Sequence, residues 1–141
     1  MDHRAAQEFL EGYRTTFESL EAAAITAKFA FPCQVIGQAD GVTISAATDA
    51  QQWAASIERI VAAYRVLGVA SASASSVQVL SVTSGCALVL VTWDLESAGA
   101  SRVYSFTACY TVVETDDGPR IAAIVHDEGP KLQQALASHR A

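Results

Sequence analysis

His126 is the side chain of this sequence that is best suited to acid–base chemistry. It lies in the strand-like run Arg120–Glu128, and a histidine titrates near working pH, so it can accept or donate a proton. A tyrosine or Asp94 would complete an acid–base pair with it. Asp127 is its neighbour in the sequence, but adjacent strand residues point to opposite faces and cannot enter the same pocket. The other interpretation of His126 is a structural role within its strand.

The aromatic side chains are a second group that could bind a ligand. If a hairpin around Gly99 pairs Trp93 with Tyr104, several aromatic rings fall on one face of a sheet. That face would carry Trp93, Tyr104, Phe106 and Tyr110, and helices would offer Tyr13 with Trp53 or Tyr64. Such a pocket is mostly apolar with a few hydroxyl and indole donors, which suits a small hydrophobic or aromatic molecule. The same rings could instead form a core or a dimer interface.

Composition argues against metal, cofactor and nucleic-acid sites. Cys33, Cys86 and Cys109 are widely spaced and lie in apolar strands or beside Pro32, which predicts buried free thiols. The sequence has neither a CxxC pair nor a His/Cys ligand spacing, so we expect no structural metal and no cofactor. The net charge is −6 and the nine Lys and Arg residues are not clustered, which argues against nucleic-acid binding.

No stretch of the chain has the composition of a membrane anchor or a leader. The sequence is 51% hydrophobic, yet no apolar run approaches the roughly 20 residues that a spanning helix needs. The start, MDHRAAQEFLEGY, is too charged for a signal peptide. We therefore expect a soluble, cytoplasmic protein with no membrane partner. It is predicted to form one domain over residues 1–141, with 129–141 as a short helical or disordered tail.

The strands that must position these side chains make up much of the second half of the chain. Three runs of β-forming residues are separated by small residues, Asp and Gly, which predicts an antiparallel meander of Cys86–Glu96, Arg102–Glu114 and Arg120–Glu128. Val69–Thr83 alternates Ala with Ser and changes phase at Ser75-Ser76, which predicts a long strand with a bulge. Earlier in the chain, Gln34–Gln38 and Val42–Ser45 flank the turn Ala39-Asp40-Gly41, which predicts a short hairpin.

Both faces of the predicted sheet are apolar near its middle. Side chains alternate faces along a strand, so the first run of the meander presents two different sets. These are Ala87, Val89, Val91, Trp93 and Leu95 on one face, and Cys86, Leu88, Leu90, Thr92 and Asp94 on the other. A sheet with one face in water would show cleaner polar alternation. We therefore expect helices on one side and a partner subunit or a further layer on the other.

Two long helices and a short one are expected before the strands. Apolar residues spaced by three and four predict an amphipathic helix from Asp2 to about Ala24, followed by a short helical turn through Ile25–Phe29. The second long helix is predicted to begin at a capping box, with Thr48 as N-cap and Gln51 reaching back to it. It is predicted to stop at Gly68.

The order helix, short helix, small hairpin, long helix and four long strands resembles the nuclear transport factor 2-like superfamily, also called SnoaL-like or cystatin-like. LEGYRTTFESLEAAAITAKFAFP looks like its opening helix pair, and GPRIAAIVHDE looks like its closing strand. The resemblance covers nearly the whole chain. It implies an α+β fold in which a curved, largely antiparallel sheet wraps around two long N-terminal-half helices as a cone-shaped α+β barrel. It also implies an apolar pocket at the open end and a homodimer packed through the convex sheet face.

Enzymes of this superfamily provide three tests of the candidate residues. Similarity to ketosteroid isomerase implies that Tyr13 is an oxyanion donor. The base position then falls near Gly37 and the late acid near Cys109 or Tyr110; none of these is a carboxylate, so we reject that dyad. Similarity to limonene epoxide hydrolase implies that Asp94, Arg102 and Asp127 act together as a catalytic trio. The alternative is that these charged side chains are only solvated, since Asp94 and Arg102 lie near a turn. Scytalone dehydratase needs two pocket histidines, whereas only His126 lies in a predicted strand.

Three functions therefore stay open at this stage. The leading prediction is a small-molecule-binding domain whose ligand-binding residues are Tyr13, Trp53, Trp93, Tyr104, Tyr110 and His126. The second is an enzyme of the isomerase, dehydratase or cyclase type, with His126, Asp94 and Tyr13 as catalytic residues. The third is a non-catalytic dimeric interaction module, in which the protein's own side chains fill the pocket.

Overall fold

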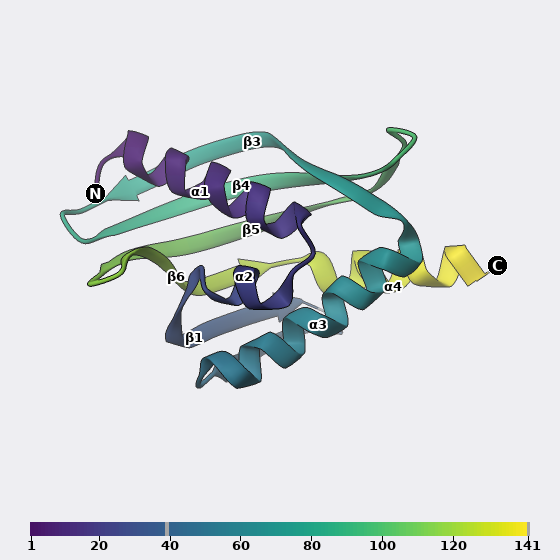
Figure 1. The fold of residues 1–141 in the computed structure, drawn as a ribbon, viewed down its shortest axis with the longest axis horizontal. Coiled ribbons are helices and arrows are strands. Elements are labelled where there is room, and N and C mark those ends of the chain that lie inside the picture. Colours follow the sequence, from purple (N-terminus) through teal and green to yellow (C-terminus); the bar gives the residue numbers. More distant parts are fainter. Residues whose placement is uncertain (39, 141) are drawn as a thin grey trace.

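The computed structural model describes residues 1–38 and 40–140, and within them it has an α+β architecture of one mixed sheet and four helices (Figure 1). The helices are α1 (His3–Glu18), α2 (Ala22–Thr26), α3 (Ala50–Leu67) and α4 (Glu128–Arg140). The strands are β1 (Phe29–Gln38), β2 (Val42–Ala47), β3 (Val69–Val82), β4 (Cys86–Ser97), β5 (Arg102–Thr115) and β6 (Gly118–His126). The predicted fold class is therefore confirmed.

The six strands form a curved, open sheet in the order β2-β1-β6-β5-β4-β3. All neighbours are antiparallel except β1 and β6, which pair in parallel. The predicted meander is confirmed as β4, β5 and β6, with β3 added on its outer side. The predicted hairpin is also present as β1 and β2. Ala39, which belongs to the predicted turn of this hairpin, lies outside the described residues.

Two details of strand register bear on the site. Trp93 lies opposite Phe106, and Tyr104 lies opposite Leu95. The predicted pairing of Trp93 with Tyr104 is therefore wrong by two residues, one of which is due to the register shift after Leu95. A shift of two keeps every side chain on its predicted face. The bulge predicted at the phase change of β3 is confirmed by a register shift between Ala74 and Ser76.

The helix ends follow from local hydrogen bonds. α1 is capped by Asp2, whose carboxylate accepts the Ala5 N–H at 2.8 Å. It ends at Glu18, earlier than predicted, because Leu20 has a left-handed φ of 55° that a helix cannot continue through. α2 accordingly begins at Ala22, earlier than the predicted Ile25–Phe29, and Phe29 belongs to β1.

The capping box of α3 is displaced by one residue from its prediction. Asp49, not Thr48, is the N-cap, and its carboxylate accepts the Gln52 N–H at 2.8 Å. Gln52 in turn accepts the Thr48 N–H at 2.7 Å. A carboxylate caps at least as well as a hydroxyl, so the cap forms one position later, and Gln52 reaches back to the residue before the N-cap. The end at Gly68 is confirmed, with a φ of 72° that glycine adopts without strain.

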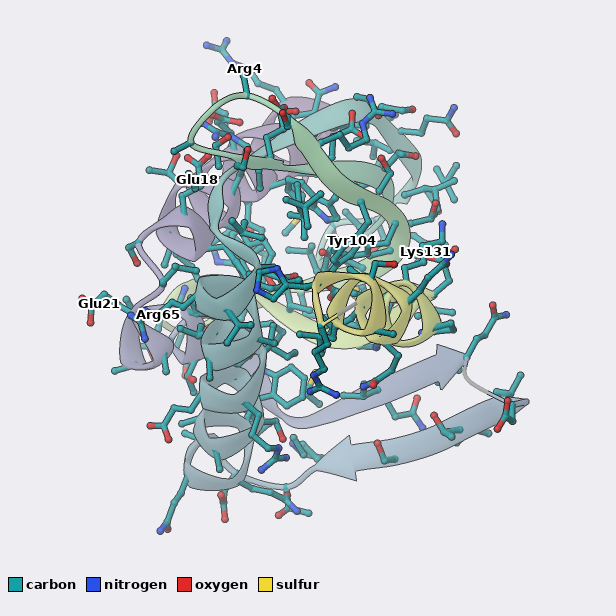
Figure 2. All side chains as sticks on the ribbon, turned by 90° about the vertical axis from the view of Figure 1, so that its right-hand side faces the viewer. Arg4, Glu18, Glu21, Arg65, Tyr104 and Lys131 are labelled. Carbon is teal, nitrogen blue, oxygen red and sulfur yellow. The ribbon has the colours of Figure 1, made fainter. Side chains whose placement is uncertain are left out.

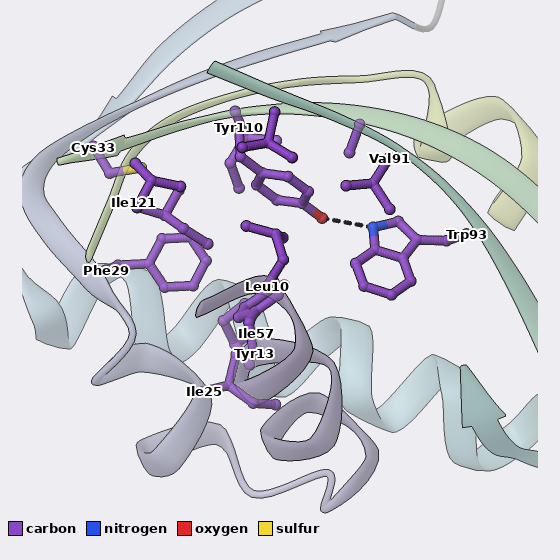
Figure 3. Packing of buried hydrophobic residues seen from close by; sticks show 14 of the residues in the cluster. Leu10, Tyr13, Ile25, Phe29, Cys33, Ile57, Val91, Trp93, Tyr110 and Ile121 are labelled. Atoms are coloured by element: carbon purple, nitrogen blue, oxygen red, sulfur yellow. Dashed lines mark hydrogen bonds between the residues drawn. The ribbon is translucent and has the colours of Figure 1, made fainter. Parts of the chain in front are cut away.

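One face of the sheet is buried against the helices. Figure 1 shows α1, α2 and α3 on the same side of the sheet, and α1 packs against β3 and β4. The buried face of β4 is the predicted Trp93 set, whose members Val89 and Val91 are fully buried (Figure 3). The predicted tail forms α4, which packs against β5 and β1, while Ala141 lies outside the described residues.

The opposite, convex face of the sheet is partly exposed in the described chain. Its apolar side chains follow one cross-strand row through Leu90, Cys109, Val125, Ile36 and Ile44. Val125 is 45% exposed and Ile44 is 71% exposed. The two faces therefore differ, because the helices cover only one of them.

Candidate functional site

A cavity of about 70 Å³ lies between the buried face of the sheet and helices α1 and α3. Its walls are mostly aromatic and aliphatic, and its polar side chains are few. The lining residues are Tyr13, Arg14, Phe17, Trp53, Ile57, Ile60, Tyr64, Ala72, Trp93, Leu95, Phe106, Ala108, Tyr110, Ile124, His126 and Glu128. The cavity is thus an apolar space that the sheet and the helices build together.

The Trp93–Tyr110 pair forms one part of the wall. The indole Nε1–H of Trp93 donates a hydrogen bond of 2.8 Å to the hydroxyl oxygen of Tyr110 (Figure 3). Tyr13 packs its ring edge-to-face on Tyr110, with ring centroids 5.7 Å apart. Burial raises the pKa of Tyr110 and of Tyr13 above the ordinary value for tyrosine. This part of the wall therefore stays neutral at working pH.

The Glu128 cluster, made of Tyr64, Tyr104 and Glu128, forms a different part of the site. The hydroxyls of Tyr64 and Tyr104 both donate to Glu128 Oε2, the latter at 2.6 Å. Glu128 begins α4, Tyr64 belongs to α3, and Tyr104 lies in β5 beside α4 (Figure 2). Burial raises the pKa of Glu128, and the two hydroxyl donors partly oppose that rise. The cluster therefore joins three elements through one buried ionisable group.

His126 stands next to this cluster. Its Nδ1 accepts a hydrogen bond of 3.2 Å from the backbone N–H of Glu128. A neutral imidazole whose Nδ1 accepts must carry its hydrogen on Nε2. Burial lowers the pKa of His126, and the nearby Asp127 only partly opposes this, so the neutral form is favoured. A Cβ on Gly37 would lie 3.6 Å from Nε2, so the ring packs against the bare backbone of β1.

Trp53 brings a polar atom without a partner. Its side chain lines the cavity and packs edge-to-face on Phe29, with ring centroids 5.3 Å apart. The indole Nε1–H is buried and has no acceptor within residues 1–38 and 40–140. A buried donor of this kind costs free energy unless water or a ligand accepts from it.

The structure brings most of the predicted ligand-binding residues to one place. Tyr13, Trp53, Trp93, Tyr110 and His126 all line the cavity. Tyr104 does not line it, but its hydroxyl reaches Glu128, which does. The residues predicted from the strand pattern and from the two helices therefore converge, although they come from five different elements.

Asp94 and Asp127 lie elsewhere. Trp93 and Leu95 line the cavity, so Asp94 between them points to the convex face, where the Ser105 hydroxyl donates to it. Arg102 is 3.8 Å from Asp94, on an exposed side chain. Asp127 instead accepts the backbone N–H of Thr107 at 2.8 Å. The structure therefore brings neither carboxylate together with His126, and the predicted His126–Asp94 pair is not formed.

Glu128 is the cavity residue that sequence reasoning missed. We placed it at the end of a strand, although the strand ends at His126 and α4 begins at Glu128. Strand parity does not reach Glu128, because β6 ends two residues before it. The two tyrosine donors could not be found this way, since they come from distant segments.

The three cysteines differ in their exposure to solvent. Cys33 is buried and Cys109 is partly buried, but Cys86 is exposed, so the prediction of a buried thiol is wrong at Cys86. Cys86 is the first residue of β4 and belongs to the face opposite the buried Trp93 set. In the part of the chain that the structure describes, no three His, Cys, Asp or Glu side chains are grouped to hold a metal ion.

The comparisons with known proteins fit this geometry. A profile described as "NTF2-like protein (DUF6841)" matches residues 2–129. The chain belongs to this NTF2-like family. Comparison with the curated proteins finds no match. Among the helices of the described residues, none is long and apolar enough to cross a membrane.

Solved structures of NTF2-like and cystatin-like folds are similar to this member of the family. An NTF2-like protein with a cystatin-like fold from Novosphingobium aromaticivorans has a TM-score of 0.68 and 15% identity, over 96% of this chain and 88% of that one. Aln2 from a Streptomyces species has a TM-score of 0.67 and 15% identity, over 89% of each chain. A cystatin-like domain from Nostoc punctiforme has a TM-score of 0.64 and 18% identity, over 99% and 84%. At these identities the similarity concerns the fold.

Proposed function

We propose that this NTF2-like protein binds a small, largely apolar or aromatic molecule in the cavity between its sheet and its helices. The observation that carries the proposal is the division of the wall into a large aromatic and aliphatic part and a small polar part at His126 and Glu128. Ligand sites combine apolar walls with a few placed polar groups in this way. A filled core would instead leave no space for such groups to face.

The size of the cavity limits the ligand. An engineered cavity of about 150 Å³ in another protein holds one benzene molecule. The cavity here is about 70 Å³, less than half of that volume, so even a single-ring molecule requires side chains of the wall to move. Edge-to-face contacts with the lining aromatic rings would hold such a ring.

Isothermal titration calorimetry with toluene and p-cresol tests the proposal. We expect saturable binding of at least one of them to the unmodified protein. Ala108→Leu places a larger side chain in the cavity wall and should abolish that binding. Thr107→Val, on the other face of β5, is the matched control and should leave it unchanged. Absence of binding to the unmodified protein, or equal binding to Ala108→Leu, would contradict the proposal.

We also propose that the convex sheet face is the contact between two copies of the chain. The apolar row through Leu90, Val125 and Ile44 supports this, because contiguous exposed apolar side chains favour association. One patch that meets its own copy forms a closed dimer. Sedimentation equilibrium should give a dimer, and Val125→Lys should give a folded monomer. A monomer before substitution, or a dimer after it, would contradict this second proposal.

A further inference from the structure

The Glu128 carboxyl, at the polar end of the cavity, accepts hydrogen bonds through one of its two oxygens. Glu128 Oε2 accepts hydrogen bonds from Tyr64 and Tyr104. The other oxygen, Oε1, has no hydrogen-bond partner among the residues that the structure describes. Glu128 is only 9% exposed and lines the cavity. A ligand group that pairs with Oε1 would therefore be favoured.

Two donors on the cavity wall are also unused. His126 accepts at Nδ1, so its Nε2–H is the group left to donate, and no described residue accepts from it. Trp53 presents the buried indole N–H without an acceptor in the described chain. Both side chains line the same cavity as Glu128. These three side chains therefore offer one acceptor and two donors to a ligand.

The Glu128 acceptor and the two N–H donors disfavour most polar groups that a ligand could carry. A ligand carboxylate would meet the carboxyl of Glu128, and like charges in a buried site repel. A ligand ammonium group would face the N–H donors of His126 and Trp53, to which it can only donate. A ketone accepts hydrogen bonds but leaves Oε1 of an ionised Glu128 without a donor. A hydroxyl both donates and accepts, so it satisfies Glu128 in either protonation state.

We propose that the cavity selects a single-ring phenol, with its hydroxyl bound between Glu128 Oε1 and His126 Nε2 and its ring against the aromatic wall. This inference rests on the proposed function, because it names the class of ligand for the same cavity. Tyr64 and Tyr104 are positioning residues, since they hold the Glu128 carboxyl through its other oxygen.

The decisive quantity is the ratio of the toluene dissociation constant to that of p-cresol, measured by calorimetry at pH 8. The two probes differ by one hydroxyl. Burying a hydroxyl without partners is unfavourable, so an apolar cavity would prefer toluene. Hydrogen bonds to a charged group reverse this preference, and we expect a ratio of about 10 or more. Asp94→Asn, an acid-to-amide change outside the cavity, should keep that ratio.

Two substitutions test the partners separately. Glu128→Met preserves the length of the side chain and removes the acceptor, and His126→Leu removes the donor. Each should bring the ratio to about 1 or below while toluene still binds. If Glu128→Met does not fold, as judged by circular dichroism, the result for His126→Leu decides.

The outcomes separate this inference from the function on which it rests. If both probes bind the unmodified protein with a ratio near 1, the cavity binds rings and the selection of phenols is wrong. A ratio that stays near 10 in the folded variants would also overturn the inference, because Glu128 and His126 would not be the partners. If neither probe binds, the proposed function itself fails.

Discussion

Two hydrogen-bonded groups of aromatic residues contribute side chains to the wall of this cavity, and they differ in one respect. The Trp93–Tyr110 pair is closed and neutral, because the only donor of Trp93 meets the hydroxyl of Tyr110. The Glu128 cluster is built on an ionisable carboxyl whose second oxygen is unpaired in the described residues. The first group therefore contributes shape and stability, and the second contributes a site that responds to protons and to ligands. The predictions below test this difference.

Removing the Trp93–Tyr110 pair should have the largest effect. Trp93→Ala deletes a buried aromatic side chain and should lower the free energy of unfolding by about 3–5 kcal/mol. Trp93→Phe keeps most of the ring and should cost less. Urea unfolding followed by circular dichroism measures both. Equal losses for the two variants would show that packing in this wall contributes little.

Removing one hydroxyl from each group should separate them by pH. Tyr110→Phe leaves the Trp93 N–H without its acceptor, and we expect a loss of about 1–3 kcal/mol that is the same at pH 5 and pH 8. Tyr104→Phe removes a donor that stabilises the ionised Glu128, so its cost should be larger at pH 8 than at pH 5. Urea unfolding at the two values tests both variants. If the loss of unfolding free energy depends on pH in the same way for both variants, the difference between the two groups is contradicted.

Glu128 should make stability fall as pH rises. Its pKa is raised above the ordinary 4.5, so the folded state holds this proton more tightly than the unfolded state. The resulting stabilisation is fully present below pH 4.5 and is lost as pH rises through the folded pKa. Glu128→Gln should remove this decline. Glu58→Gln, on the exposed side of α3, is the matched control. An unchanged profile for Glu128→Gln would refute the assignment.

His126 should have the smallest effect, with the opposite sign. Burial lowers its pKa below the ordinary 6.5, so the folded state binds this proton less tightly than the unfolded state. Stability should therefore decrease as pH falls below 6.5 toward the folded pKa. A titration of the His126 Cε1–H resonance measures the pKa directly. A value at or above 6.5 would mean that the ring is not buried in the neutral form.

The fold was predictable because its signals are local. The Ala-Ser alternation with a phase change at Ser75-Ser76 identified β3 and its bulge, and Gly68 identified the end of α3. The alternation around Trp93 identified which side chains share a face of the sheet, and the structure shows that this face is the buried one. Errors were confined to positions where two local solutions compete, such as Asp49 against Thr48 as N-cap.

The site was predictable only in part, because its chemistry depends on tertiary contacts. The aromatic wall follows from strand parity, which holds even though the Trp93 register was wrong by two residues. The Glu128 cluster does not follow from any local pattern, since Tyr64 and Tyr104 are 64 and 24 residues away in sequence. Asp94 was misassigned although strand parity places it on the face opposite Trp93, where its partner is Ser105, a cross-strand neighbour.

The most direct test of the account is a nuclear magnetic resonance titration of the two indole N–H signals with p-cresol. Trp53 and Trp93 both line the cavity, and the described chain leaves the Trp53 N–H without an acceptor. We predict that both signals shift together and saturate. Signals that stay unchanged while p-cresol perturbs only the convex face, around Val125 and Ile44, would contradict the account.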